Sequence, residues 1–156
     1  MKGDKRVIDC LNDVLTAELT GINQYFLHSK MCRNWGYERL AHENYAESIG
    51  EMKHASDLVE RILFLEGVPN LQKLDKIRVG ESVGEQLQLD RDLEVAAIDR
   101  LRNGIALCWQ VGDHGSRELL EHVLVHEEKH LDWLETQLTL LQQLGATAYL
   151  AEQLRK

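Results

Sequence analysis

The chain has 156 residues, of which 44% are hydrophobic and 28% are charged, and its formal net charge is −8 at pH 7. This acidic balance argues against nucleic-acid binding, which needs a basic surface, and it favours encounters with cations. No apolar run is long enough for a membrane span and residues 1–10 lack the apolar core of a signal peptide, so we expect a cytoplasmic protein without a membrane partner.

The composition is typical of helices, with one proline, few aromatic residues and no alternating β-branched runs. Apolar residues recur at helical spacing over residues 5–35 and 38–65, and again over residues 83–111 and 116–143. A last amphipathic segment, residues 147–154, is too short to be stable alone and should dock on the rest of the chain.

The connection between the second and third helices, residues 66–82, decides the topology. The second helix is about 42 Å long at ~1.5 Å per residue, whereas the connection reaches about 55 Å when extended. It can therefore run along the whole second helix, while the short turns make the other consecutive pairs antiparallel. We predict a single all-α domain over residues 1–156, a four-helix bundle with one long crossover.

One pattern of glutamate and histidine occurs twice. Each set has a lone glutamate on one helix and a Glu-x-x-His pair thirty-three residues later on the next, and the second set follows the first by 76 residues. The helix lengths place all of these side chains near the middle of the bundle. The six residues are Glu18, Glu51, His54, Glu94, Glu127 and His130.

The chemistry of this set predicts a dinuclear metal site. Four carboxylates on otherwise apolar helix faces need compensating positive charge, and no lysine or arginine shares these faces. Two divalent cations supply it, with both histidines neutral. Carboxylate-rich ligands with one imidazole per ion suit iron or manganese rather than structural zinc. Surface glutamates in helix pairs are the alternative, but they do not explain the matched spacing and depth.

Several neighbouring side chains have two interpretations. Tyr25 and Trp133 lie within two turns of these residues and either supply electrons or hydrogen bonds, or only fill space. His122 and His126 precede His130 at four-residue steps and form either a second metal face or a solvent-facing row. We favour the solvent-facing row, because the core stripe of this helix follows other positions.

Met52 points about 100° away from Glu51, off the bundle core. An outward apolar surface around it implies a partner. The spacing favours a plain dimer interface over a haem site. The other residues expected on this surface are Leu19, Ile22, Asn23, Phe26, Tyr45, Ile49 and Ala55.

Four stretches resemble the bacterioferritin family: residues 23–28 (Asn-Gln-Tyr-Phe-Leu-His), 51–55 (Glu-Met-Lys-His-Ala), 60–67 and 132–136 (Asp-Trp-Leu-Glu-Thr). The resemblance covers nearly the whole chain. It implies a ferritin-like fold, with a short fifth C-terminal helix after the bundle. It also implies a homo-oligomeric shell of twenty-four subunits that stores iron mineral.

The resemblance further implies a role for each site residue. The six glutamates and histidines become a di-iron ferroxidase centre that oxidises Fe(II) with O₂ or H₂O₂, with Tyr25 as a further catalytic residue. Met52 becomes the axial ligand of haem b, with one haem shared by each pair of two-fold-related subunits. A small iron–sulfur protein, a bacterioferritin-associated ferredoxin, is the implied reductant.

Three positions depart from the pattern of some family members. Ala46 and Gly50 stand where these members have a histidine and an aspartate for an extra iron site facing the cavity, so we expect that site to be absent. Leu58 stands where some have a tyrosine. Electron supply then falls more heavily on Tyr25 and Trp133.

Two other functions remain open at this stage. The first is a rubrerythrin-like di-iron peroxidase, although such proteins usually carry a Cys-x-x-Cys iron domain. Here Cys10, Cys32 and Cys108 are scattered, and we expect them to be reduced. The second is a shell subunit that only binds haem while a sister chain carries out catalysis, and the complete ligand set argues against it.

Overall fold

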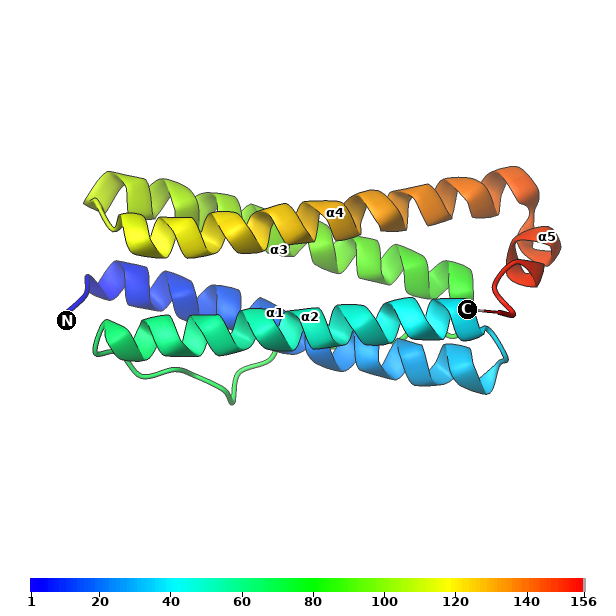
Figure 1. The fold of residues 1–156 in the computed structure, drawn as a ribbon, viewed down its shortest axis with the longest axis horizontal. Coiled ribbons are helices and arrows are strands. Elements are labelled where there is room, and N and C mark those ends of the chain that lie inside the picture. Colours follow the sequence, from blue (N-terminus) through cyan, green and yellow to red (C-terminus); the bar gives the residue numbers. More distant parts are fainter. Residues whose placement is uncertain (156) are drawn as a thin grey trace.

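The computed structural model describes residues 1–155, and Figure 1 shows four long helices side by side with a short fifth helix across one end. Their bounds confirm the predicted bundle with its short C-terminal helix: α1 (Lys5–Asn34), α2 (Glu38–Phe64), α3 (Val83–Val111), α4 (His114–Leu144) and α5 (Ala146–Ala151). Helix α4 begins two residues earlier than predicted. The reason is a cap, since the Asp113 carboxylate accepts a hydrogen bond from the Ser116 amide at 3.0 Å.

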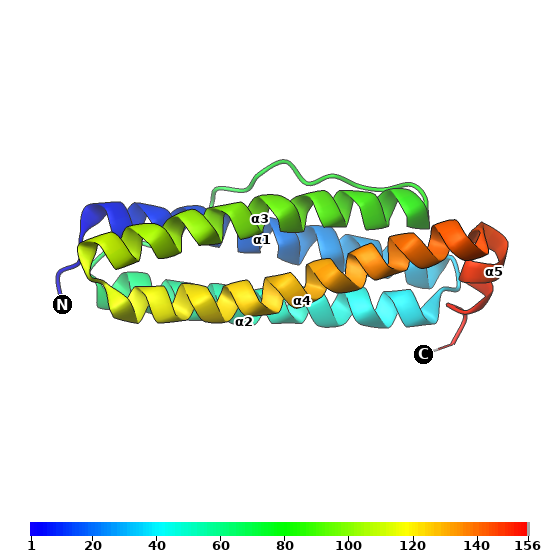
Figure 2. The ribbon, with the colours of Figure 1, turned by 90° about the horizontal axis from the view of Figure 1, so that it is seen from above.

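The helices form two antiparallel hairpins, α1–α2 and α3–α4, joined by the crossover. Figure 2 shows α1 and α3 on one side of the molecule, with the crossover running along them, and α2 and α4 on the other. Helices α1 and α3 approach each other more closely than α2 and α4 do. The wider α2–α4 side therefore leaves room for side chains between the two backbones.

Apolar side chains form two clusters, one toward each end of the bundle. One contains residues such as Leu11, Leu58 and Leu120, and the other contains Leu40 and Leu134. In every long helix the predicted site residues lie between the positions that contribute to these two clusters. Hydrophobic burial thus fixes the helices on both sides of a polar layer.

The crossover is held against α1 by polar side chains along one face of that helix. The Asn70 amide donates to Oδ1 of Asn12 at 2.8 Å, and the Asp75 amide donates to Oγ1 of Thr20 at 3.0 Å. Further along, the Arg78 amide donates to Oε1 of Gln24 at 3.1 Å. These bonds satisfy backbone groups of a segment that has no helix or strand of its own, so the crossover follows a defined path.

The last of these contacts belongs to a buried polar network. The Gly80 amide donates to Nε2 of His28 at 3.0 Å, so Nδ1 carries the ring proton and donates to Oδ1 of Asp90 at 2.9 Å. The Gln24 side chain also donates to Asp90, at 2.8 Å. One carboxylate on α3 thereby orients two α1 side chains that hold the crossover.

Helix α5 docks on the end of the bundle, as the sequence predicts for an amphipathic segment of this length. Tyr149 is buried and its hydroxyl donates to Oε1 of Gln137 on α4 at 2.7 Å. The side chain of Gln153 donates to the Tyr149 carbonyl at 3.3 Å, and the Arg39 amide donates to the Gln153 carbonyl at 3.0 Å. The C-terminal segment therefore contacts both α2 and α4.

The three cysteines, Cys10, Cys32 and Cys108, are free thiols, as the sequence predicts. Cys32 and Cys108 are buried, and Cys10 is half-buried. Within residues 1–155, no helix has both the length and the apolarity needed to cross a bilayer.

Candidate metal centre

Carboxylates and imidazoles from all four long helices lie in the polar layer between the apolar clusters. Each hairpin contributes a lone glutamate from its first helix and a glutamate and histidine, one turn apart, from its second. All six side chains are buried, with at most 5% of any residue exposed. They are Glu18 on α1, Glu51 and His54 on α2, Glu94 on α3, and Glu127 and His130 on α4.

One half of the layer is organised around His54. Its Nδ1 atom lies 3.4 Å from Oε2 of Glu18 and 3.2 Å from Oε1 of Glu127. The ligand atoms of Glu51, His54, Glu127 and one more histidine, His126, all lie within 4.8 Å of one another. This half therefore brings side chains from α1, α2 and α4 together.

The other half is organised around His130. Its Nδ1 atom lies 2.8 Å from Oε1 of Glu94, and the Tyr25 hydroxyl donates to the same carboxylate oxygen. The edge of the Tyr25 ring faces His130, with ring centroids 5.0 Å apart. Glu94, Glu127 and His130 form a second group whose ligand atoms lie within 4.8 Å of one another. Glu127 belongs to both groups and so connects the two halves.

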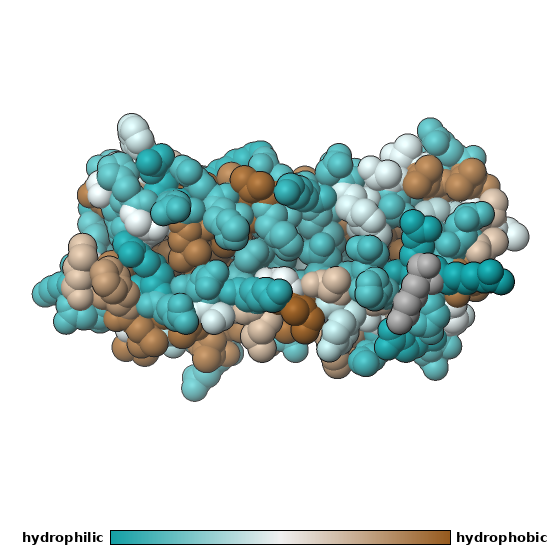
Figure 3. All heavy atoms as spheres, in the orientation of Figure 1, coloured by the Kyte–Doolittle hydropathy of each residue, from teal (hydrophilic) through white to brown (hydrophobic). Residues whose placement is uncertain are grey.

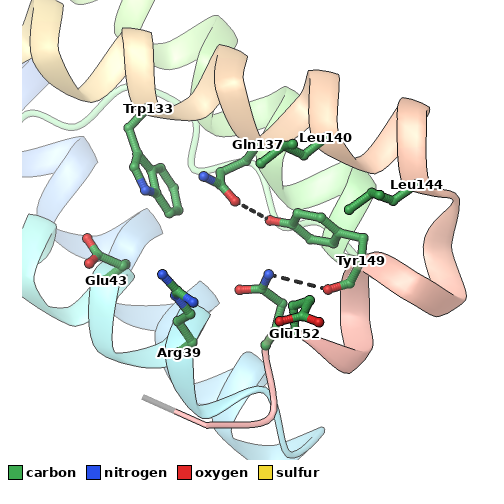
Figure 4. Close-up of a pocket in the computed structure, with 9 residues that line it drawn as sticks. Arg39, Glu43, Trp133, Gln137, Leu140, Leu144, Tyr149 and Glu152 are labelled. Carbon is green, nitrogen blue, oxygen red and sulfur yellow. Dashed lines mark hydrogen bonds between the residues drawn. The ribbon is translucent and has the colours of Figure 1, made fainter.

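Trp133 packs against the His130 half from the α5 end. Its ring stacks on His130, with centroids 6.2 Å apart and planes 23° from parallel. On its other side, Trp133 lines a cavity of about 260 Å³ near α5, where Figure 4 shows Arg39 and Glu43 nearby. The indole is therefore one of the groups that separate the centre from this cavity.

The carboxylates of the layer lack the partners that buried anions require. One oxygen each of Glu18, Glu51 and Glu94, and both oxygens of Glu127, are buried without a hydrogen bond. Among the described residues, the ion pairs of these four glutamates are all with histidine, never with lysine or arginine. Unpartnered buried oxygens of this kind fit hard divalent cations.

The protein alone relieves this unfavourable charge by holding protons. Burial raises the pKa of Glu18 to about 6, and burial together with the charge of Glu127 raises the pKa of Glu94 to about 8. Burial alone would lower the pKa of both histidines. Their carboxylate partners outweigh it and raise the pKa to about 10 for His54 and about 9 for His130. Cations that bind here must therefore displace protons.

At the centre itself, the structure corrects the prediction for His126 and adds one residue. His122 is exposed, as predicted, but His126 is half-buried, and its ring lies edge-on against His54 with centroids 4.6 Å apart. Burial, followed by the positive charge of His54, lowers the pKa of His126. Glu47, which the sequence analysis missed, has Oε2 3.6 Å from Nδ1 of His130. Its position one turn before Glu51 was the only available signal.

The outward surface around Met52 is smaller than predicted. Met52, Phe26, Tyr45 and Ile49 are exposed, but Ala55 is only 3% exposed and belongs to the apolar core. Leu19 and Ile22 are partly buried and pack against the same cluster. The prediction for Ala55 was wrong because Ala55 lies four residues after Glu51, on the helix face that points into the core.

Comparison with known proteins agrees with the fold and with the composition of the polar layer. Residues 8–144 match the family model of the ferritin-like domain. A bacterioferritin of Streptomyces coelicolor is 51% identical over 151 residues, which cover 97% of this chain and 90% of that protein. One from Mycolicibacterium paratuberculosis is 47% identical over 152 residues, covering 97% and 96%. One from Brucella melitensis is 44% identical over 149 residues, covering 96% and 92%.

A four-helix bundle with one long crossover and a buried layer of glutamates and histidines defines the class of ferritin-like proteins. Within that class, the sequence identity of 47–51% to bacterioferritins, over 97% of this chain, decides the family. The chain belongs to the bacterioferritin family.

Proposed function

We propose that this chain stores iron and oxidises Fe(II) to Fe(III) at the buried polar layer. The observation that supports this is the meeting of four glutamates and two histidines in the bundle interior, with carboxylate oxygens that no protein group satisfies. Membership of the bacterioferritin family supports the iron-storage part independently. We further propose that residues 1–156 act as one ferritin-like domain, because both hairpins contribute to this centre.

The geometry supports a particular division of the ligands. Glu18 and His54 would hold one Fe(II), and Glu94 and His130 would hold the other, since each histidine lies beside the glutamate of its pair. Glu51 and Glu127 would lie between the ions, as the shared position of Glu127 suggests. Two Fe(II) would lose two electrons in total, and these electrons, together with two protons, would reduce O₂ to H₂O₂ or H₂O₂ to two water molecules.

Replacing Glu18 or His130 by alanine tests this function. We expect rapid Fe(II) oxidation to fall by more than about tenfold in each variant, since even the loss of a group behind a metal ligand costs about 10–100-fold. The measurement is stopped-flow absorbance after addition of Fe(II) to the metal-free protein in air. Glu128→Ala is the matched control, because Glu128 is adjacent to Glu127 but exposed. Undiminished oxidation in both site variants would refute the proposal.

We also propose that Met52 binds haem b at an interface between two copies of the chain. Met52 is 56% exposed on α2, and the apolar side chains of Phe26 on α1 and Ile49 on α2 are exposed as well. In Figure 3, hydrophobic residues gather along the left part of the lower edge, where Figure 1 places the C-terminal end of α2 and the crossover. One chain supplies half of a haem pocket, so the haem would need Met52 from each of two chains. Haem ligated in this way transfers single electrons.

The haem assignment is tested by Met52→Leu, which keeps the side chain apolar and removes the sulfur. We expect the purified protein to show a low-spin haem spectrum, and the variant to lose it. The control is Met31→Leu, a change at a half-buried methionine near the far end of α1. A low-spin spectrum that persists in Met52→Leu would place the ligand elsewhere.

The assembly and its reductant are further parts of the proposal. Family membership supports a homo-oligomeric shell, for which we expect twenty-four subunits, and a small iron–sulfur ferredoxin as electron donor. Sedimentation velocity tests the assembly. A dimer or tetramer would instead favour the rubrerythrin-like peroxidase as the function of the same centre.

A further inference from the structure

The two copies of the repeat differ at the position just before the glutamate of each Glu-x-x-His pair. The displacement of 76 residues that superposes Glu51 on Glu127 also superposes Gly50 on His126. A residue with no side chain on α2 thus corresponds to an imidazole on α4. Each copy of the repeat supplies two glutamates and one histidine to the ligand set. His126 is a further histidine that has no counterpart in the first copy.

In the structure, His126 occupies space that Gly50 leaves open. A Cβ atom added at Gly50 would lie 3.1 Å from Cε1 of the His126 ring, which is closer than ordinary packing allows. The wide α2–α4 side of the bundle gives the ring access to the centre. There it lies against His54, with ring centroids 4.6 Å apart.

The His126 side chain has no other role among the described contacts. Its Nδ1 atom is buried and makes no hydrogen bond. Its ligand atom lies within 4.8 Å of those of Glu51, His54 and Glu127, each of which also lies within 4.8 Å of the others. Atoms bound at about 2.0–2.2 Å to one ion are at most about 4.4 Å apart. A shift of less than about 1 Å per atom therefore brings all four into one coordination sphere.

We propose that His126 is an additional metal ligand, which supplies a second imidazole to the ion held by His54. This rests on the proposed dinuclear centre and extends it. The His54 ion then has two imidazoles, whereas the other has His130 alone, with the Glu47 carboxylate beside it. The two ions of the centre are chemically unequal, and imidazole-preferring metals such as Co(II) and Zn(II) bind more tightly on the His54 side.

Co(II) binding to the metal-free protein tests this assignment without any turnover. Affinities are measured by competition with a chromophoric chelator, and imidazole ligands per ion by X-ray absorption. We expect the wild-type protein to bind two Co(II) per chain with three imidazoles between them. In His126→Ala, one of the two ions should bind at least about tenfold more weakly, and the imidazole count should fall to two.

Two further variants separate ligation from packing. His122→Ala removes an exposed histidine one turn earlier on the same helix and should change neither readout. His126→Gln retains side-chain bulk and should lose the imidazole as His126→Ala does. The inference is overturned if His126→Ala keeps both affinities and the imidazole count, or if His126→Gln restores both affinities. If the wild-type protein fails to bind two ions, the dinuclear centre itself fails.

Discussion

The Tyr25 hydroxyl illustrates how a single buried group orients the centre. It is 1% exposed and donates to the Glu94 oxygen that also faces Nδ1 of His130. Burial and the negative charges of Glu94 and Asp90 raise the pKa of Tyr25 well above its usual value, so the phenol keeps its proton and remains a donor. Tyr25 thereby fixes one oxygen of Glu94, and the other is left without a hydrogen bond.

Tyr25→Phe should weaken metal binding on the His130 side by about tenfold, because a group that orients a metal ligand usually contributes that much. The ring still fills its buried site, so we expect the free energy of unfolding to change by no more than about 1–2 kcal/mol. Competition titration with Co(II) and urea unfolding measure the two effects. Tyr45→Phe, on the exposed surface, is the control. Equal Co(II) affinity in Tyr25→Phe and the wild type would assign Tyr25 to packing alone.

At the scale of secondary-structure elements, the long crossover depends on α1 and α3 rather than on its own structure. Asp90 on α3 accepts hydrogen bonds from Gln24 and His28, and His28 in turn accepts from the Gly80 amide. Because all three side chains are buried, an unpartnered member of this network would be costly. The network lies only one turn along α3 from Glu94, so it also fixes the register of that helix near the centre.

Asp90→Ala should destabilise the protein by about 2–6 kcal/mol, because it leaves two buried donors without an acceptor and each costs about 1–3 kcal/mol. We expect a lower urea midpoint and faster amide exchange over residues 70–82. Asp92→Ala is the matched control, since Asp92 lies on the same helix and is exposed. If amide exchange in the crossover is unchanged while the midpoint falls, the network stabilises the bundle without holding the crossover.

At the scale of the whole molecule, the buried glutamates and histidines make stability depend on pH. The native metal-free protein binds more protons than the unfolded chain, because the pKa values of Glu18, Glu94, His54 and His130 are all raised by folding. The stabilisation from the two histidines is fully present below about pH 6.5, the unfolded value, and is lost as pH rises toward about 9–10. The raised carboxyl pKa values act in the same direction.

We therefore expect the metal-free protein to be less stable at pH 8 than at pH 6. The stabilisation by bound Zn(II) should instead increase from pH 6 to pH 8, since cations displace these protons. At a free concentration of 100 times Kd, bound Zn(II) adds about 2.7 kcal/mol per site. Thermal midpoints with Zn(II) or with a chelator, taken from pH 6 to pH 8, measure the difference. It should grow with pH and be smaller in His130→Ala. A metal effect independent of pH would mean that the centre does not hold these protons.

Sequence periodicity alone predicted the helices, the antiparallel hairpins and the crossover, because helix formation and chain length are local properties. The repeated spacing of glutamates and histidines also named the side chains that meet between the apolar clusters, while their catalytic role, the haem and the cytoplasmic location stay predictions. The side chains that hold the crossover were harder to predict from the sequence. Gln24 and His28 appeared only as part of a family resemblance, and nothing local indicated that they hold a segment more than fifty residues away.

The orientation of His126 shows the limit most clearly. Its helical phase alone predicts exposure, and that prediction failed because α2 and α4 diverge and Gly50 leaves an opening on the facing helix. A sequence states where a side chain lies around its own helix. The packing of the whole bundle decides how far away the neighbouring helix lies and which of its residues face that side chain. The amino-acid pattern thus determined the fold and the types of side chain in the polar layer, and only the tertiary structure decided which further groups reach that layer.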